Sequence, residues 1–263
     1  MAENTARSAA KGVVIMFKQA NGLKYSTFMA GLHRDVLLNW YLEVGCRTGR
    51  IFANARGKTI AVDLFFRADT NIIGTKPALH VFQQTSDDFF ASDVLKALKA
   101  KLSFSFLDGM HLFEFLLRDF IATEKASDPK GVIALHDCCP FSHEMTTRDL
   151  SAIPKHAWTG DVWKLIPILM KHRPDLRITV LDAAPTGVVM ISGLDPKSKV
   201  LERKYAEIVA QYTKMTLEDF GLEAFNALFD YEDTAAFVAA GYPLFKGVKL
   251  SEDAALKPEK VTP

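Results

Sequence analysis

Two glycines and an acidic residue have the spacing of a site that binds a nucleoside. Gly45 and Gly49 follow a short apolar run at residues 40–44, and Asp63 closes the next such run at residues 59–63. A ligand that crosses the carboxyl end of a parallel strand approaches the backbone closely, so the turn there needs residues without a Cβ atom. An acid at the end of the next strand can accept hydrogen bonds from both ribose hydroxyls of an adenosine. The alternative is that the glycines only shape a tight turn and that Asp63 caps a nearby segment.

Four titratable residues follow two later apolar runs and are candidates for acid–base chemistry. Asp108 and His111 come after one run, and His136 and Asp137 come after the next. A histidine with an ordinary pKa near 6.5 is largely neutral at pH 7 and can accept a proton from a reacting hydroxyl. Each histidine taken alone is equally consistent with a hydrogen-bonded structural residue. Two histidines and two acids at the ends of neighbouring strands favour a site.

The runs that precede these residues predict a parallel sheet buried on both faces. Most of them are continuously apolar and do not alternate with polar residues, which is typical of strands covered by helices on each side. The last two runs are joined by only four residues, which is too short for a parallel crossover, so this pair is expected to be antiparallel. The expected strands are residues 40–44, 59–63, 79–82, 103–107, 131–135, 177–181 and 187–191.

Helical periodicity appears between several of these strands. The segment 111–125 places apolar residues on one face, and the segment 161–172 does the same. Asp161 is the expected N-cap of the second segment, in which Pro167 predicts a kink. A short helix is expected at 51–55. We divide the chain into a helical extension at 1–38, an α/β core at 39–196 and a C-terminal part at 197–263. The last part comprises expected helices at 199–215 and 217–229 and a frayed tail from residue 251.

Composition excludes several classes of protein. The chain has 263 residues and a formal net charge of +1, and its cations form no basic stripe, which argues against nucleic-acid binding. The apolar stretches are too short to span a membrane or to form a signal peptide. Three cysteines, two of them adjacent, form neither a disulfide framework nor a zinc motif, so a cytoplasmic location is expected. A homo-oligomer is possible.

The motifs together resemble those of class I S-adenosylmethionine-dependent methyltransferases. The resemblance starts from Glu43-Val44-Gly45-x-x-x-Gly49 with Asp63, and extends to the segments 106–111, 131–137 and 158–164. It is similar to a bacterial subfamily of small O-methyltransferase-like proteins and covers about residues 39–195. The resemblance implies a Rossmann-like, doubly wound α/β fold whose seven-stranded, mostly parallel sheet has the order 3-2-1-4-5-7-6, the last strand being antiparallel.

The same resemblance implies roles for individual residues around bound S-adenosylmethionine. Gly45 and Gly49 would border the methionyl and adenosyl groups, and a bulky residue at position 45 would abolish binding while leaving the fold stable. Glu43 and Asp108 would lie near the amino-acid end of the cofactor, and Asp63 would bind the ribose. The adenine amine would meet the segment that follows the third strand. The cofactor-binding residues implied are therefore Glu43, Gly45, Gly49, Asp63, Ser86, Asp87 and Asp108.

The implied reaction is O-methylation of a small-molecule or glycan-type hydroxyl. His111, His136 and Asp137 are the candidate catalytic residues, because removal of the hydroxyl proton is the main chemical demand. Metal-dependent O-methyltransferases are similar in placing acids after strands four and five, so Asp108 and Asp137 are candidate ligands of Mg²⁺ or another divalent cation. A non-catalytic nucleoside-binding or assembly module is the alternative. A nicotinamide-dependent oxidoreductase is disfavoured by Arg47 and by the missing third glycine.

Overall fold

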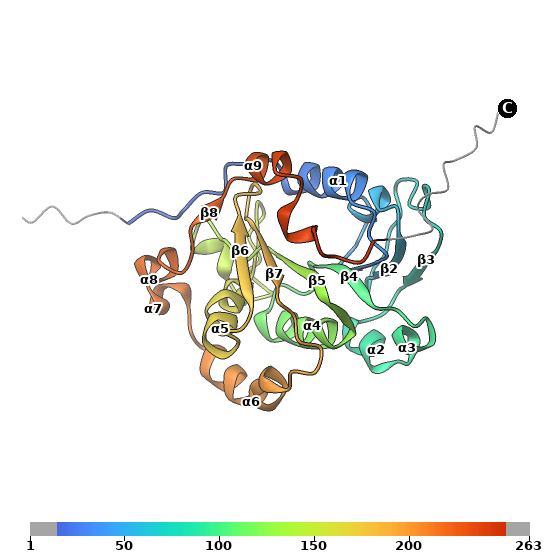
Figure 1. Cartoon of the computed structure of the whole chain (residues 1–263). Helices are drawn as coiled ribbons and strands as arrows, with labels where there is room; N and C mark the ends of the chain where they lie inside the picture. The colour runs from blue at the N-terminus through green and yellow to red at the C-terminus, as the bar shows by residue number, and fades with distance from the viewer. Residues whose placement is uncertain (1–14, 251–263) are drawn as a thin grey trace, which may run out of the picture.

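The computed structural model describes residues 15–250, in which one mixed sheet carries helices on both faces (Figure 1). The sheet has eight strands in the order β3-β2-β1-β4-β5-β7-β6-β8. This order confirms the predicted doubly wound arrangement and adds one strand to it. The strands are β1 (Trp40–Val44), β2 (Lys58–Val62), β3 (Leu79–Phe82), β4 (Leu102–Leu107), β5 (Ser127–His136), β6 (Arg177–Leu181), β7 (Val188–Ser192) and β8 (Tyr231–Glu232).

The central strands are buried along their whole length, as their apolar sequences predict. Every residue of β1 and β4 is buried, and both strands have parallel neighbours on each side. Strand β7 runs antiparallel to both β5 and β6, as the short connection before it predicts. The carboxyl ends of β1, β2, β4 and β5 therefore lie along one edge of the sheet, which brings together the segments that follow them.

Two apolar layers fill the space between the sheet and its helices. Helices α1 and α9 and the short helices η1 and η4 cover one face, whereas α2, α4, α5 and α6 cover the other (Figure 1). The helices are α1 (Tyr25–Asp35), α2 (Ser86–Ala91), α3 (Val94–Ala97), α4 (Phe113–Ala126), α5 (Leu165–His172), α6 (Val200–Tyr212), α7 (Leu217–Phe220), α8 (Leu222–Asn226) and α9 (Thr234–Ala239); the 3₁₀ turns are η1 (Phe52–Asn54), η2 (Glu144–Thr146), η3 (Val162–Lys164) and η4 (Pro243–Phe245). Among residues 15–250, none of the helices has the length and apolar character needed to cross a bilayer.

The eighth strand was not predicted, because its signal in the sequence is too short. Strand β8 has only two residues, Tyr231 and Glu232, and pairs parallel to the end of β6. It covers an edge that would otherwise expose unpaired backbone groups. The C-terminal part of the chain thus completes the sheet. The expected tail beyond residue 250 lies outside the described residues.

Three helical predictions were wrong in detail. The helix expected at 51–55 is only the 3₁₀ turn η1. The helix expected at 161–172 is divided into the 3₁₀ turn η3 and α5, which begins at Leu165, so Pro167 falls in the first turn of α5, where the missing N–H has no helical partner to lose. The helix expected at 217–229 is broken into α7 and α8 at Gly221, whose φ of 90° no helix accommodates.

Candidate active site

The glycine turn after β1 packs directly against the segment that follows β4. Gly45 has a φ of 83°, and a Cβ atom built on it would lie 1.9 Å from the carbonyl oxygen of Asp108. Gly49 has a φ of 77°, and its Cβ would lie 2.6 Å from the side chain of Ile72. Both glycines therefore have a structural reason to be glycine that involves no ligand. The same close packing brings Asp108 to the mouth of the turn.

Asp63 lies directly after β2, and its side chain links the glycine turn to the loop that follows β2. Its Oδ2 atom accepts a hydrogen bond from the backbone N–H of Arg47 at 2.6 Å, and its Oδ1 atom accepts one from the N–H of Phe65 at 2.7 Å. The capping role considered from the sequence is thus present. A carboxylate has about four lone-pair sites, so these two bonds leave acceptor capacity for hydroxyl groups of a ligand.

Glu43 is an acid buried beneath the glycine turn. Its side chain is 1% exposed, and the Tyr41 hydroxyl donates a hydrogen bond to Oε2 at 2.7 Å. Burial raises the pKa of Glu43 to about 8, although the hydrogen bond from Tyr41 opposes this shift. A cationic group placed nearby would favour the ionised form of Glu43. The residue is therefore suited to a ligand that brings a positive charge.

Asp108, His111 and Asp137 form a compact cluster at the carboxyl ends of β4 and β5. One potential ligand atom from each residue can be chosen so that all three lie within 4.8 Å of one another. His111 Nε2 is 3.3 Å from Asp108 Oδ1 and also 3.3 Å from Asp137 Oδ2. The Thr186 hydroxyl donates to the other oxygen of Asp137 at 2.6 Å. The cluster thus directs three donor atoms at one small volume.

The ring of His111 is oriented by the backbone. Its Nδ1 atom lies 2.9 Å from the carbonyl oxygen of Trp158, which can only accept, so Nδ1 carries a proton. Nε2 then faces two carboxylates and needs either a second proton or a cation beside it. A histidine that donates through one nitrogen to a carbonyl and presents the other to a group of acids is a common arrangement of metal ligands.

His136 lies behind this cluster and is less suited to act as a base. It is 6% exposed, and its Nδ1 atom is 3.2 Å from Asp108 Oδ1 and 3.5 Å from Asp137 Oδ1. Burial lowers its pKa, but the charges of Asp137 and Asp108 outweigh burial and raise the pKa to about 9. The two carboxylates therefore favour the protonated imidazolium over the neutral imidazole expected from the sequence.

Tyr25 covers His136 and was missed by sequence analysis. The two rings are 4.1 Å apart between centroids, and burial together with the charges of Asp108, Asp137 and Glu43 raises the pKa of Tyr25 to about 12. The Tyr25 N–H donates to the carbonyl of Ala184 at 3.0 Å, which fixes the start of α1. Tyr25 lies in a segment without a motif, so only its tertiary contacts reveal it.

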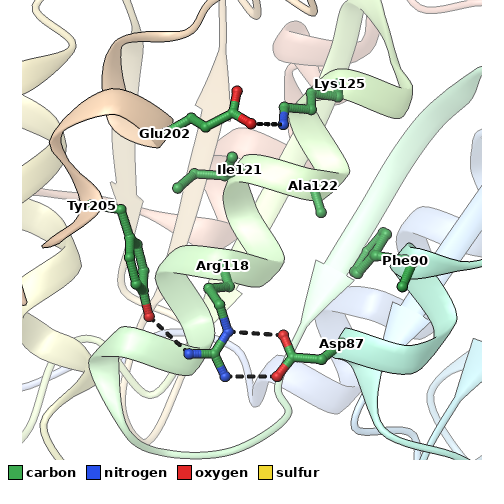
Figure 2. A pocket seen from close by; sticks show the side chains of 9 residues that line it. Asp87, Phe90, Arg118, Ile121, Ala122, Lys125, Glu202 and Tyr205 are labelled. Carbon is green, nitrogen blue, oxygen red and sulfur yellow. Dashed lines mark hydrogen bonds and ion pairs between the residues drawn. The ribbon is translucent and has the colours of Figure 1, made fainter.

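Ser86 and Asp87 lie at the start of α2, where both are already engaged with α4. Asp87 accepts two hydrogen bonds from Arg118, at 2.8 and 2.7 Å, and Arg118 also donates to the Tyr205 hydroxyl (Figure 2). These side chains line an open groove of about 380 Å³ between α2, α4 and α6. The Ser86 side chain hydrogen-bonds Asp119, whose pKa is raised to about 7 by burial. Asp87 is thus paired with the guanidinium group of Arg118 on α4.

A loop from a distant part of the sequence holds His111 in place. A Cβ atom on Gly160 would lie 1.6 Å from the carbonyl oxygen of His111, and the N–H of Asp161 donates to that oxygen at 3.2 Å. Asp161 occupies the expected N-cap position, directly before η3, but its side chain makes no capping hydrogen bond there. Its Oδ1 atom instead accepts from the N–H of Phe113 at 2.9 Å and so caps α4.

Comparison with known proteins identifies the domain. Residues 40–138 match the sequence profile of a family described as a methyltransferase domain, and this segment contains the glycine turn, Asp63 and the cluster. No curated protein matches the sequence. Residues 40–138 are therefore a methyltransferase domain, which confirms the family and the fold predicted from the sequence.

Solved structures of methyltransferases are distantly similar. The O-methyltransferase TomG of Streptomyces achromogenes, in complex with SAM, is 16% identical with a TM-score of 0.43, covering 64% of this chain and 78% of TomG. PaMTH1 of Podospora anserina, bound to SAH, is 15% identical with a TM-score of 0.43, at 65% and 78% coverage. MycE, in complex with Mg and SAH, is 13% identical with a TM-score of 0.43; the match covers 66% of this chain and 49% of MycE.

Proposed function

We propose that the protein is an S-adenosylmethionine-dependent methyltransferase that acts on a hydroxyl group of a small molecule. The observation that carries this proposal is the cluster of Asp108, His111 and Asp137 at the carboxyl edge of the sheet, inside a methyltransferase domain. Acids and an oriented histidine at that edge are what deprotonation of an acceptor hydroxyl requires. The sulfonium of bound S-adenosylmethionine supplies an electrophilic methyl group, so the protein has mainly to align the two reactants.

The cofactor would lie across the glycine turn between Asp63 and Asp108. Asp63 has lone pairs left for the ribose hydroxyls after its two backbone hydrogen bonds. Glu43 is buried below the turn and Asp108 borders it, so the ammonium group of the cofactor would meet two acids. Ser86 and Asp87 begin α2, and Ser86 is the better candidate for the adenine because Arg118 binds both carboxylate oxygens of Asp87, whereas Ser86 makes one bond, to Asp119.

The cluster fits a divalent cation. Asp108 and Asp137 would each supply a carboxylate oxygen, and Nε2 of His111 would supply the third donor. Oxygen donors suit Mg²⁺ or Mn²⁺, and the single imidazole makes Mn²⁺ a good probe. When bound, such an ion would lower the pKa of the acceptor hydroxyl and help to orient it. A hydrogen bond from the Thr186 hydroxyl orients Asp137, and a hydrogen bond to the carbonyl oxygen of Trp158 orients His111.

Replacement of Asp63 tests the cofactor site. Asp63→Ala should weaken binding of S-adenosylhomocysteine at least about tenfold, because a hydrogen bond to a charged group contributes about 1.5–3 kcal/mol. Isothermal calorimetry on the folded variant measures this. Because Asp63 also accepts from Arg47 and Phe65, Asp63→Asn is the matched control: it keeps one acceptor oxygen and should lose less affinity. Unchanged affinity in Asp63→Ala would contradict the proposed site. Tight binding without turnover of any hydroxyl acceptor would favour a nucleoside-binding module.

Removal of metal tests the role of the cluster. Methyl transfer to a hydroxyl acceptor, found by screening with labelled S-adenosylmethionine, should fall strongly in EDTA and recover on addition of magnesium. Mn²⁺ binding followed by electron paramagnetic resonance should be lost in Asp108→Asn and retained in Asp87→Asn, a control acid outside the cluster. Full turnover in chelator would show that the cluster acts without a metal.

A further inference from the structure

The segment 22–25, which leads into α1, lies along the connection between β6 and β7, residues 182–187 (Figure 1). Three hydrogen bonds, each from a main-chain N–H to a carbonyl oxygen, join the two. They run from Gly22 to Asp182 at 2.8 Å, from Ala184 to Leu23 at 2.9 Å and from Tyr25 to Ala184 at 3.0 Å. The pairing includes a parallel bridge, in which Lys24 lies opposite Ala184. The position of this connection therefore depends on the segment 22–25.

Gly22 is where the two segments approach each other most closely. A Cβ atom built on it would lie 2.0 Å from Asp182 Oδ1 and 2.3 Å from Thr234 Oγ1. Both of these atoms are already engaged, because Asp182 Oδ1 accepts from the N–H of Thr234 at 2.8 Å and the Thr234 hydroxyl accepts from the N–H of Leu23 at 2.8 Å. A larger residue at position 22 would therefore push the segment away from the connection.

The other end of the same connection reaches the cluster. Thr186 is 3% exposed, and its hydroxyl donates to Asp137 Oδ1 at 2.6 Å. The carbonyl oxygen of Thr186 accepts from the N–H of Cys139 at 3.1 Å, so the residue is bonded on both sides of Asp137. Asp137 has a φ of 59°, a left-handed conformation that residues other than glycine seldom adopt. Such a conformation persists where the surrounding structure holds it.

This hydrogen bond leaves the second carboxylate oxygen of Asp137 facing the cluster. Oδ2 lies 3.3 Å from His111 Nε2, whereas Oδ1 is taken up by Thr186. The other group described near Oδ1 is His136, whose Nδ1 lies at 3.5 Å. A partner that hydrogen-bonds a ligating carboxylate orients it, and loss of such a partner commonly lowers metal affinity 10–100-fold.

We propose that the segment 22–25 is part of the metal site, because it fixes the β6–β7 connection and Thr186 on that connection is a positioning residue for Asp137. The inference rests on the proposed function, in which Asp137 is a ligand of a divalent cation. The segment lies outside residues 40–138, which match the methyltransferase domain. Affinity for the ion would thus depend on residues that do not touch it and that precede the domain.

Two matched pairs of variants test the proposal, with Mn²⁺ alone as the probe and electron paramagnetic resonance as the measurement. Thr186→Val keeps the shape of the side chain but removes the donor, so it should bind Mn²⁺ about tenfold more weakly or worse. Thr186→Ser keeps the hydroxyl and should retain most of the affinity. Gly22→Ala should also lose about tenfold, because the new Cβ displaces the segment.

Gly247→Ala is the control for Gly22→Ala. Neither glycine has a positive φ, and a Cβ on Gly247 would meet nothing closer than 3.8 Å, so this variant should bind Mn²⁺ normally. Circular dichroism shows that each variant is folded. Calorimetry without metal should give an unchanged affinity for S-adenosylhomocysteine, because neither Thr186 nor Gly22 is part of the proposed cofactor site.

Each other result has a distinct meaning. Normal Mn²⁺ binding in Thr186→Val would overturn the role of Thr186, and equal losses in Thr186→Val and Thr186→Ser would overturn the role of its hydroxyl. Normal binding in Gly22→Ala would show that the segment 22–25 does not act on the site. A matching loss of affinity for S-adenosylhomocysteine would indicate general damage and would overturn the proposal too. Failure of the unmodified protein to bind Mn²⁺ would instead remove the metal from the proposed function, and this inference with it.

Discussion

Replacement of Gly45 by alanine is expected to destabilise the protein by about 3–5 kcal/mol, a large share of the total stability of a domain. The new Cβ would lie 1.9 Å from the carbonyl oxygen of Asp108, a distance that no real Cβ adopts. The backbone cannot move away easily, because the N–H of Gly45 donates to Val62 and the N–H of Asp108 donates to Val44. Urea denaturation followed by circular dichroism measures the loss.

Gly241 provides the matched control for this substitution. It has a φ of 72°, close to the 83° of Gly45, but a Cβ built on it meets nothing within 4 Å. Gly241→Ala therefore isolates the cost of the backbone conformation, which is about 1 kcal/mol. The difference between the two variants measures the steric contact with β4. If Gly45→Ala is as stable as Gly241→Ala and fails only to bind ligand, the glycine is needed for the cofactor and not for the fold, as the sequence suggested.

The sheet and the site edge could be predicted because both follow from local sequence patterns. A continuously apolar run is sufficient to indicate a buried strand, and parallel strands bring their carboxyl ends to one edge. Asp108, His111 and Asp137 could therefore be placed together without a structure. The strand order needed the resemblance to a known family, since pairing between distant strands leaves no mark in either strand alone.

The remaining parts of the site depend on contacts between distant segments. Tyr25 lies in a segment without a motif and reaches the site only through packing. Asp161 was expected to cap the helix that follows it, but it caps α4, which is 48 residues earlier in the chain. The structural reason for a glycine at position 45 could not be predicted either. A glycine that makes room for a ligand and one that makes room for a neighbouring strand look the same in a sequence.

Removal of the Asp161 carboxylate is expected to destabilise the protein by about 3–5 kcal/mol, because a buried cation would lose its partner. Asp161 is 2% exposed, and its Oδ2 atom accepts hydrogen bonds from Lys164 and Arg148, each at 2.6 Å. Lys164 is fully buried and otherwise donates only to the carbonyl of Tyr212 among the described residues. Asp161→Ala would leave this lysine and the N–H of Phe113 without the carboxylate.

A double-mutant cycle separates the charge pair from the cap on α4. Lys164→Met fills a similar volume without a charge, so the double variant Asp161→Ala/Lys164→Met should recover much of the stability lost in Asp161→Ala. The part of the stability that is not recovered is the cost of the hydrogen bonds that Phe113 N–H and Arg148 lose. Arg148 keeps Glu114 as a partner at 2.7 Å. Denaturant unfolding of all four proteins gives the coupling. If the double variant is no more stable than Asp161→Ala, the unpaired lysine does not cause the loss of stability. The loss would then come from the missing cap on α4.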